Sequence, residues 1–305
     1  MTGRSRATAS GRGRASGRDP ARGRGAATRI GASGPRADAG LYGPDSEAWR
    51  LNREAMLLLG AGPRALLLQV AHPLVAEGVE QHSAFRTDPW RRLAETLRSY
   101  LRIVYGTTGV ARAEIRRLNA LHRSIAGPVL DPVAAARHGT SYEARDPELS
   151  LWVHATLVDS TIVAVDRWLA PLSHERRARF YAETRPIGRA FGIPEARLPA
   201  DVDAFDDYVS AMLAPDGPIH PTATARSQAA VILRPPLVPF GPDRTPWLRR
   251  VPRVAYAWTM WPAISLLPEL QRVEYGLAWG PLERAVSAWL VASWRGWRSV
   301  LPSSF

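Results

Sequence analysis

The chain of 305 residues contains no cysteine. This absence excludes disulfide bonds, zinc sites with cysteine ligands, iron–sulfur clusters and thiolate-ligated haem. Lysine is absent as well, so all 40 basic residues are arginine. Together with the frequent alanine, glycine and proline, this composition is typical of a GC-rich genome, and we do not interpret it as selection for guanidinium chemistry.

The motifs of several common enzyme classes are also missing. The sequence has no P-loop, GxGxxG, GxSxG or HExxH pattern, and no Glu-x-x-His pair of the kind that binds two irons in a helical bundle. No run of about 18 apolar residues free of charge occurs, which predicts no transmembrane helix. Residues 275–297 come closest, and their tryptophan and arginine content suits a packed terminal helix better than a membrane surface. We therefore expect at most peripheral membrane contact.

The first 40 residues differ in composition from the remainder. They hold nine arginines and two aspartates, a net charge of +7 out of the formal +12. With few large apolar side chains, such a segment cannot offset its ordering entropy, so we predict a disordered tail over 1–40 and a folded domain over 41–305. The tail lacks the apolar run of a secretory signal. Arginine–glycine tails can contact RNA, but a solvated extension is the better interpretation, and we expect no specific nucleic-acid partner.

Turn signals and apolar periodicity divide the folded part into helices without convincing strand alternation, which predicts a single all-α domain. Asp-Pro pairs at 88–89 and 146–147 are typical helix starts, with Asp as N-cap and Pro as the first helical residue. We expect helices near 46–59, 63–73, 89–105, 110–126, 147–169, 173–191, 201–213, 222–232 and within 247–300. The helix over 89–105 should turn inward the side chains of Leu93, Thr96, Leu97, Tyr100, Leu101 and Val104.

Two histidines lie on the apolar stripes of these predicted helices. His122 follows Ile115 and Leu118 at helical spacing, and His154 lies in the same way among Leu151, Val158, Thr161 and Val165. A buried histidine is most often a core residue with satisfied hydrogen bonds. In a chain without cysteine, however, two of them also indicate a core that binds iron, and iron in a porphyrin needs only one neutral imidazole as axial ligand.

The helix over 89–105 adds a second signal. Arg92 and Thr96 are four residues apart and therefore share a helical face. Such a pair can hydrogen-bond a haem-bound oxygen or a haem propionate. The alternative is a solvated arginine beside a threonine that bonds to the carbonyl four residues earlier.

Several stretches resemble the family of MpaB-type oxygenase and rubber oxygenase (latex-clearing protein) catalytic domains. They are LLLQVAHPLVAEGVEQHSAF, DPWRRLAET, the dipeptide at 105–106, LNALHRSIAG, SYEARDPELSLWVHATLVDS, the PLS and FGIP elements, and the tryptophan-rich C-terminal part. The resemblance runs from about residue 41 to 302. It implies an all-helical fold similar to that of globins and haem b as cofactor.

The resemblance also implies roles for individual residues. His122 corresponds to the axial iron ligand of rubber oxygenase, and His154 to a further family histidine that supports the haem pocket. Arg92 and Thr96 correspond to the family's Arg-x-x-x-Thr pair. Rubber oxygenase has a lysine just before that threonine, where this chain has Glu95. This departure argues against polyisoprene cleavage and suggests Glu95 as a proton-transfer group.

These observations predict a cytoplasmic or membrane-peripheral, haem b-dependent oxygenase. Its substrate would be an apolar, unsaturated or terpenoid-like small molecule, its oxidant dioxygen or peroxide, and an electron donor would be a further partner. The alternative from another class is a non-catalytic protein that binds haem or a lipophilic small molecule in the same pocket.

Overall fold

The computed structural model describes residues 38–234 and 260–300, apart from the side chains of 55–59, 297, 299 and 300. The described part is almost entirely helical, which confirms the all-α prediction, and its two short strands form one hairpin. The predicted tail lies outside the described residues except for 38–40, and so does the predicted helical stretch over 247–259.

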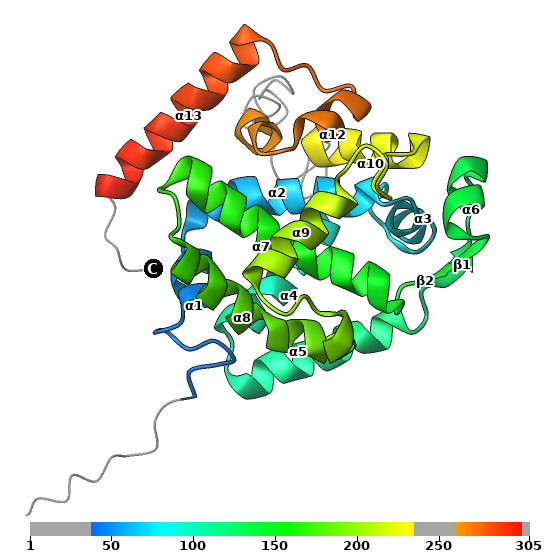
Figure 1. The fold of residues 1–305 in the computed structure, drawn as a ribbon, viewed down its shortest axis with the longest axis horizontal. Helices are drawn as coiled ribbons and strands as arrows, with labels where there is room; N and C mark the ends of the chain where they lie inside the picture. Colours follow the sequence, from blue (N-terminus) through cyan, green and yellow to red (C-terminus); the bar gives the residue numbers. More distant parts are fainter. Residues whose placement is uncertain (1–37, 235–259, 301–305) are drawn as a thin grey trace, which may run out of the picture. The chain divides into compact units, whose positions relative to one another are not determined.

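Figure 1 shows the order of the elements along the chain. They are α1 (Glu47–Asn52), α2 (Ala55–Ala71), α3 (Pro73–His82), α4 (Pro89–Tyr105), α5 (Thr108–His122), β1 (Ala126–Pro128), α6 (Pro132–His138), β2 (Ser141–Glu143), α7 (Pro147–Trp168), α8 (His174–Ala190), a 3-10 turn η1 (Glu195–Arg197), α9 (Val202–Met212), α10 (Ala223–Leu233), α12 (Glu269–Glu274) and α13 (Pro281–Val300). Residues 260–265 are also helical. The strands pair antiparallel, with Gly127 opposite Tyr142.

The long helix α7 is the centre of the fold and runs along α2 (Figure 1). Trp152 of α7 is buried and donates its indole N–H to the Leu68 carbonyl at 3.0 Å. At the other end of the pair, Trp168 packs directly on Gly60, where an added Cβ would lie 1.8 Å from the indole ring. The two helices can therefore approach closely at this point only because residue 60 has no side chain.

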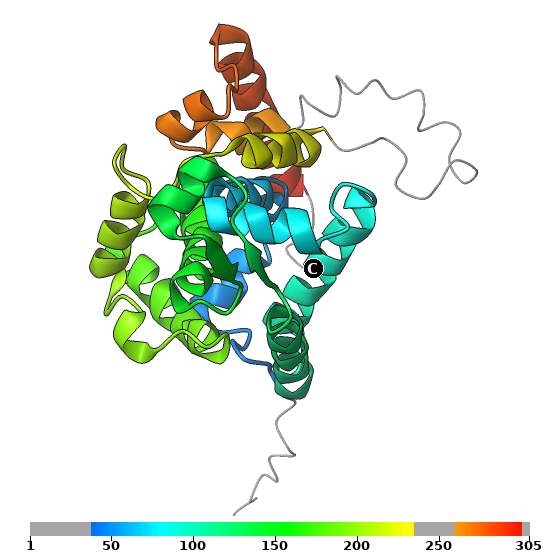
Figure 2. The ribbon, with the colours of Figure 1, turned by 90° about the vertical axis from the view of Figure 1, so that its right-hand side faces the viewer.

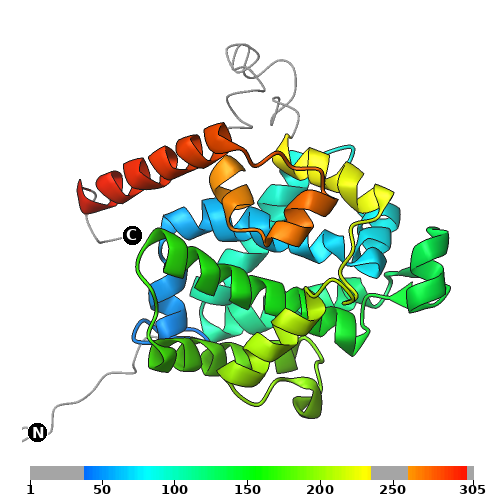
Figure 3. The same cartoon turned by 45° about the horizontal axis from the view of Figure 1, so that its top comes forward.

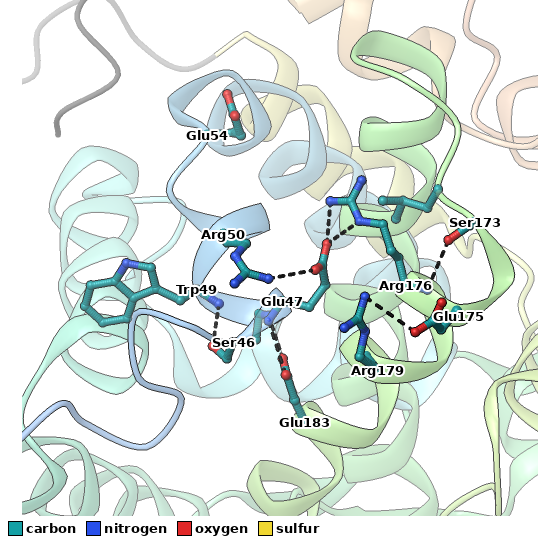
Figure 4. Close-up of polar contacts among 12 residues, drawn as sticks. Ser46, Glu47, Trp49, Arg50, Glu54, Ser173, Glu175, Arg176, Arg179 and Glu183 are labelled. Carbon is teal, nitrogen blue, oxygen red and sulfur yellow. Dashed lines mark hydrogen bonds and ion pairs between the residues drawn. The ribbon is translucent and has the colours of Figure 1, made fainter.

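Polar contacts attach α1 to α8, as Figure 4 shows. The carboxylate of Glu183 accepts hydrogen bonds from the backbone N–H groups of Glu47 and Ala48, at 3.2 and 2.7 Å, and so binds the first turn of α1. The buried carboxylate of Glu47 in turn pairs with Arg176 of α8 and, at 3.6 Å, with Arg50. Because Glu47 is buried, these arginines supply the charge partners that such a group requires.

The predicted helix starts are confirmed where an aspartate precedes the helix. The carboxylates of Asp88, Asp146 and Asp201 accept hydrogen bonds from backbone N–H groups in the first turns of α4, α7 and α9, at 2.8 to 3.0 Å. The predicted end of α8 is confirmed too, since Gly192 follows it with φ of +88°.

Three boundary predictions were wrong. The first break lies after Asn52, and α2 continues through Gly60 and Pro63, because its apolar length packs along α7. The helix predicted over 110–126 is α5, which ends at His122, while Gly127 lies in β1. The short helix α6 was not predicted, although Asp131 and the following proline repeat the same start signal.

One helix of the described residues, α7, is long and apolar enough to cross a membrane by length and composition alone. Of its most apolar window, 72% is buried inside the fold. A buried core helix of a soluble protein can meet the same criteria of length and composition.

Candidate functional site

The helices α4 and α5 form an antiparallel hairpin at the edge of the fold (Figure 2). A buried carboxylate joins them: Glu114 of α5 accepts hydrogen bonds from the Ser99 hydroxyl at 2.8 Å and from Arg117 at 2.6 Å. Arg102 of α4 adds an ion pair with Glu114 at 3.1 Å. This cluster fixes the position of α4 relative to α5 along their shared contact. The first turns of α4 therefore lie beside the last turns of α5.

Arg92 and Thr96 lie together, as their spacing predicted. Arg92 donates from Nη1 to the Thr96 hydroxyl at 2.9 Å and from Nε to the Ser83 hydroxyl at 3.2 Å. Thr96 in turn donates to the Arg92 carbonyl at 2.8 Å, which is the local bond considered as the alternative. The local bond of Thr96 is therefore present, and the hydroxyls of Thr96 and Ser83 orient the guanidinium of Arg92, while a role of Thr96 toward a cofactor stays a prediction. The contribution of Ser83 had no signal in the sequence.

His122 is the last residue of α5 and is half-buried. Its pKa lies below the usual range, first because burial disfavours the charged ring and second because of the positive charge of Arg92. The fold therefore brings Arg92 of α4 close enough to act on His122 of α5. No hydrogen-bond partner of the His122 ring is found among the described residues. A neutral imidazole with a free nitrogen is the form that binds a metal.

His154 lies on the side of α7 that faces α8. Its ring is buried against Gly188, whose added Cβ would lie 3.4 Å from the His154 Nε2. That nitrogen has no hydrogen-bond partner in the described part of the chain. Burial lowers the pKa of His154 to about 4, so the ring is neutral at pH 7.

The end of α8 connects the two predicted histidines. Asn119 of α5 donates to the Ala190 carbonyl at 2.8 Å, one turn of helix before His122. Ala190 is two residues after Gly188, which contacts His154. Both imidazoles therefore belong to helices that contact the last turn of α8.

Glu95 is in a different environment. Its carboxylate is 46% exposed and lies 3.5 Å from Arg91 on the same helix. An exposed pair at this spacing contributes little to stability. The structure thus places Glu95 at the surface of α4, with access to solvent.

The prediction that α4 turns its leucines inward was wrong. Leu93, Leu97 and Leu101 are 43%, 39% and 37% exposed, while Val104 is buried. The reason is that no element of the described residues covers this stripe of α4. Leu121 of α5 and Leu157 of α7 are exposed as well, by 46% and 40%. The three leucines of α4 recur every four residues and so form one contiguous apolar stripe, a kind of surface that can bind an apolar ligand or partner.

The donor groups fit a haem better than a bare metal ion. No three His, Cys, Asp or Glu side chains among the described residues come together as a ligand set for a metal. A haem iron needs a single neutral imidazole, and His122 offers one beside a guanidinium that suits a carboxylate such as a propionate. Two surface cavities lie elsewhere, and none of the five predicted residues lines them.

A second pair of imidazoles was not singled out in the sequence. The rings of His72 and His138 lie 5.3 Å apart between their centroids. His72 is buried and accepts a hydrogen bond from the Leu74 N–H at 3.2 Å, so it acts as the N-cap of α3. Burial lowers the pKa of His72 to about 3, which keeps this cap neutral.

The described site thus defines a helical protein in which a neutral imidazole and an oriented arginine come from successive helices. The chain belongs to the family described as "ER-bound oxygenase mpaB/B'/Rubber oxygenase, catalytic domain", whose model matches residues 49–300. This match confirms the resemblance inferred from the sequence.

Two curated relatives are uncharacterized proteins, one from Mycobacterium bovis and one from Mycobacterium tuberculosis. Each is 30% identical over 148 residues, which is 47% of this chain and 55% of the relative. The match therefore spans about half the length of these relatives. No solved structure matches the chain, so the predicted likeness to globins stays a prediction.

Proposed function

We propose that the protein is a haem b-dependent oxygenase that acts on an apolar, unsaturated or terpenoid-like small molecule. Membership of the oxygenase family supports the reaction class. The observation that supports haem as cofactor is the position of His122, a neutral imidazole within the electrostatic reach of Arg92 that has no hydrogen-bond partner among the described residues. The exposed leucine stripe of α4 supports an apolar substrate.

In this proposal each predicted residue has a defined task. His122 would hold the haem iron, and a bound haem would supply the oxidation chemistry. Arg92 would direct its N–H donors toward a propionate or toward an oxygen atom of the reactants, held in place by Thr96 and Ser83. His154 would support the pocket from α7.

Glu95 would exchange protons between solvent and the site, because its carboxylate is 46% exposed and also acts electrostatically on Arg92. Dioxygen or peroxide would be the oxidant, and an electron donor a further partner. The predicted cytoplasmic or membrane-peripheral location stays a prediction.

The competing function is a carrier that binds haem or a lipophilic molecule without turnover. The exposed leucine stripe of α4 and the Nε2 of His154, which has no hydrogen-bond partner among the described residues, favour binding but do not by themselves require a reaction. The two functions differ in one measurable respect, since only the oxygenase consumes its oxidant in proportion to the product formed.

The test compares variants of α4 in haem-loaded protein. With squalene as an apolar unsaturated probe, oxygen consumption and product are measured for Arg92→Gln, Thr96→Val and the control Arg98→Gln, which changes an exposed arginine of the same helix. Loss of one positioned donor costs about 3 kcal/mol of barrier, roughly a hundredfold in rate. We expect this loss in the first two variants with unchanged haem content, and a rate within about twofold of wild type in the control.

Other outcomes assign the residues differently. If the haem-loaded wild-type protein consumes no oxygen with squalene or with other apolar probes, the carrier function is supported. If haem content falls in parallel with activity in Arg92→Gln, that arginine anchors the haem and does not act on the reactants.

A further inference from the structure

Four arginines line one cavity at the end of α7, beside α12 and α13. The cavity has a volume of about 430 Å³ and includes the side chains of Arg167, Arg272, Arg284 and Arg295. Figure 3 shows α13 in red along the top of the described fold. None of the residues assigned to the proposed oxygenase site belongs to this cavity, so the inference is independent of haem.

The four guanidinium groups use only part of their hydrogen-bonding capacity. Arg167 donates to the Ser265 carbonyl at 3.0 Å, Arg272 to the Leu267 carbonyl, and Arg284 to the Trp279 carbonyl at 3.0 Å. Arg295 donates to the carbonyls of Trp168 and Arg167, at 2.5 and 3.0 Å. Each guanidinium carries more N–H donors than these contacts occupy.

No carboxylate within the described ranges forms an ion pair with any of the four arginines. Two carboxylates on the same helices are engaged elsewhere: Asp166 accepts from the Leu172 N–H at 2.7 Å, and Glu283 from the Gly280 N–H at 2.8 Å. Glu269 acts on Arg272 at longer range and partly opposes the lowering of its pKa. Four like charges thus surround one cavity, and no carboxylate of the described residues lies within ion-pair distance of them.

The like charges act on one another. The pKa of Arg272 lies below its usual value, chiefly because of burial and further because of the charge of Arg167. A bound anion would offset both the cost of burying the Arg272 charge and its repulsion by Arg167.

The remainder of the lining is aromatic and aliphatic. Trp168 is buried at one side of the cavity, and Val291 of α13 is buried as well. Trp279 is half-buried, with the guanidinium carbon of Arg272 at 5.4 Å from the centre of its ring. A ligand with an anionic group and an adjoining apolar part would contact both kinds of surface.

We propose that this cavity binds a phosphate group, and that the apolar lining accommodates the part of the ligand next to it. Guanidinium groups match the geometry of phosphate oxygens and present paired donors to them. Either a soluble phosphate ester or the headgroup of a phospholipid carries this chemistry. The arginine–tryptophan cavity is therefore an anion site separate from the oxygenase site.

The test introduces a competing carboxylate and leaves every arginine in place. Ala288 lines the cavity and is exposed, whereas Ala285, one turn earlier on α13, is exposed outside it. Ala288→Glu and Ala285→Glu thus change the net charge equally and differ only in position. Circular dichroism checks that both variants fold, and Arg284→Gln serves as a second variant because that arginine makes only one local contact.

Binding of inorganic phosphate is measured by calorimetry and by the shift in Tm against chloride at equal ionic strength. We expect saturable binding to wild type and Ala285→Glu, and affinity at least about tenfold weaker in Ala288→Glu and Arg284→Gln. Equal binding of phosphate by all four proteins would overturn the proposal. So would a wild-type protein that binds phosphate no better than chloride and also fails to bind the vesicles with phosphatidic acid.

The vesicle measurement distinguishes the two sources of phosphate. Sedimentation is compared for phosphatidylcholine vesicles with and without phosphatidic acid. Binding that requires phosphatidic acid and is lost in Ala288→Glu but kept in Ala285→Glu assigns the site to a lipid headgroup. Phosphate binding without vesicle binding assigns it to a soluble ester. Failure of both measurements, or loss in both variants alike, refutes the site.

Discussion

The burial of His154 predicts a specific response of the protein to acid. Its pKa of about 4 in the folded protein compares with about 6.5 for a free imidazole. Between these values the unfolded chain binds a proton that the folded chain does not, so the free energy of unfolding falls as the pH is lowered from about 6.5 to 4. A difference of about 2.5 pKa units corresponds to about 3 kcal/mol.

Replacing His154 with leucine removes this contribution and little else. Because the Nε2 atom has no hydrogen-bond partner in the part of the chain that the structure describes, we expect the free energy of unfolding at pH 7 to change by less than about 1 kcal/mol. Between pH 7 and pH 4 the wild-type protein should lose about 3 kcal/mol more than His154→Leu. Urea unfolding followed by circular dichroism at both pH values gives this difference.

All other titrating groups, including His72, are shared by the two proteins and cancel in the comparison. His174 is exposed and paired with Asp203, so His174→Gln is the matched control and should lose as much as wild type. If wild type and His154→Leu lose the same free energy on acidification, His154 is not buried in the way described. A loss above about 2 kcal/mol at pH 7 would instead show that its ring makes a stabilising hydrogen bond.

Two further predictions concern the fold. In urea unfolding, Gly60→Ala should destabilise the protein by about 3 kcal/mol or more, because the new Cβ would overlap the Trp168 ring. Gly62→Ala is the control: its Cβ meets no described atom within 4 Å, so the change should be neutral or stabilising by up to about 1 kcal/mol. A chain shortened to begin at Asp38 should keep the Tm of the full chain. A chain that begins at Leu41 should have a lower Tm, because it lacks the Asp38 carboxylate that binds the first turn of α5. Equal Tm values for the two shortened chains would contradict the second prediction.

Local signals in the sequence predicted much of the fold. Asp88, Asp146 and Asp201 each begin a helix because their short side chains bond N–H groups only a few residues away. The break predicted at Gly60 failed for the opposite reason. The role of that glycine is to admit Trp168, which is 108 positions away in the sequence and is brought there by the packing of α2 on α7.

The candidate site divides in the same way. The contact between Arg92 and Thr96 follows from helical spacing alone. The effect of Arg92 on His122 does not, because it depends on how α4 and α5 align through Glu114. Exposure was the least predictable property. The stripe of Leu93 and its neighbours is apolar and regular, as a buried face would be, and only the tertiary structure shows that no described element covers it.

The central claim is that His122 holds a haem, and titration of the purified protein with haem tests it most directly. We expect a Soret band that saturates at one haem per chain in the wild-type protein and in the surface control His174→Ala. In His122→Gly this binding should be lost and should return when free imidazole is added to occupy the vacated position. An unsaturable titration of the wild-type protein, or an unchanged spectrum and stoichiometry in His122→Gly, would contradict the claim.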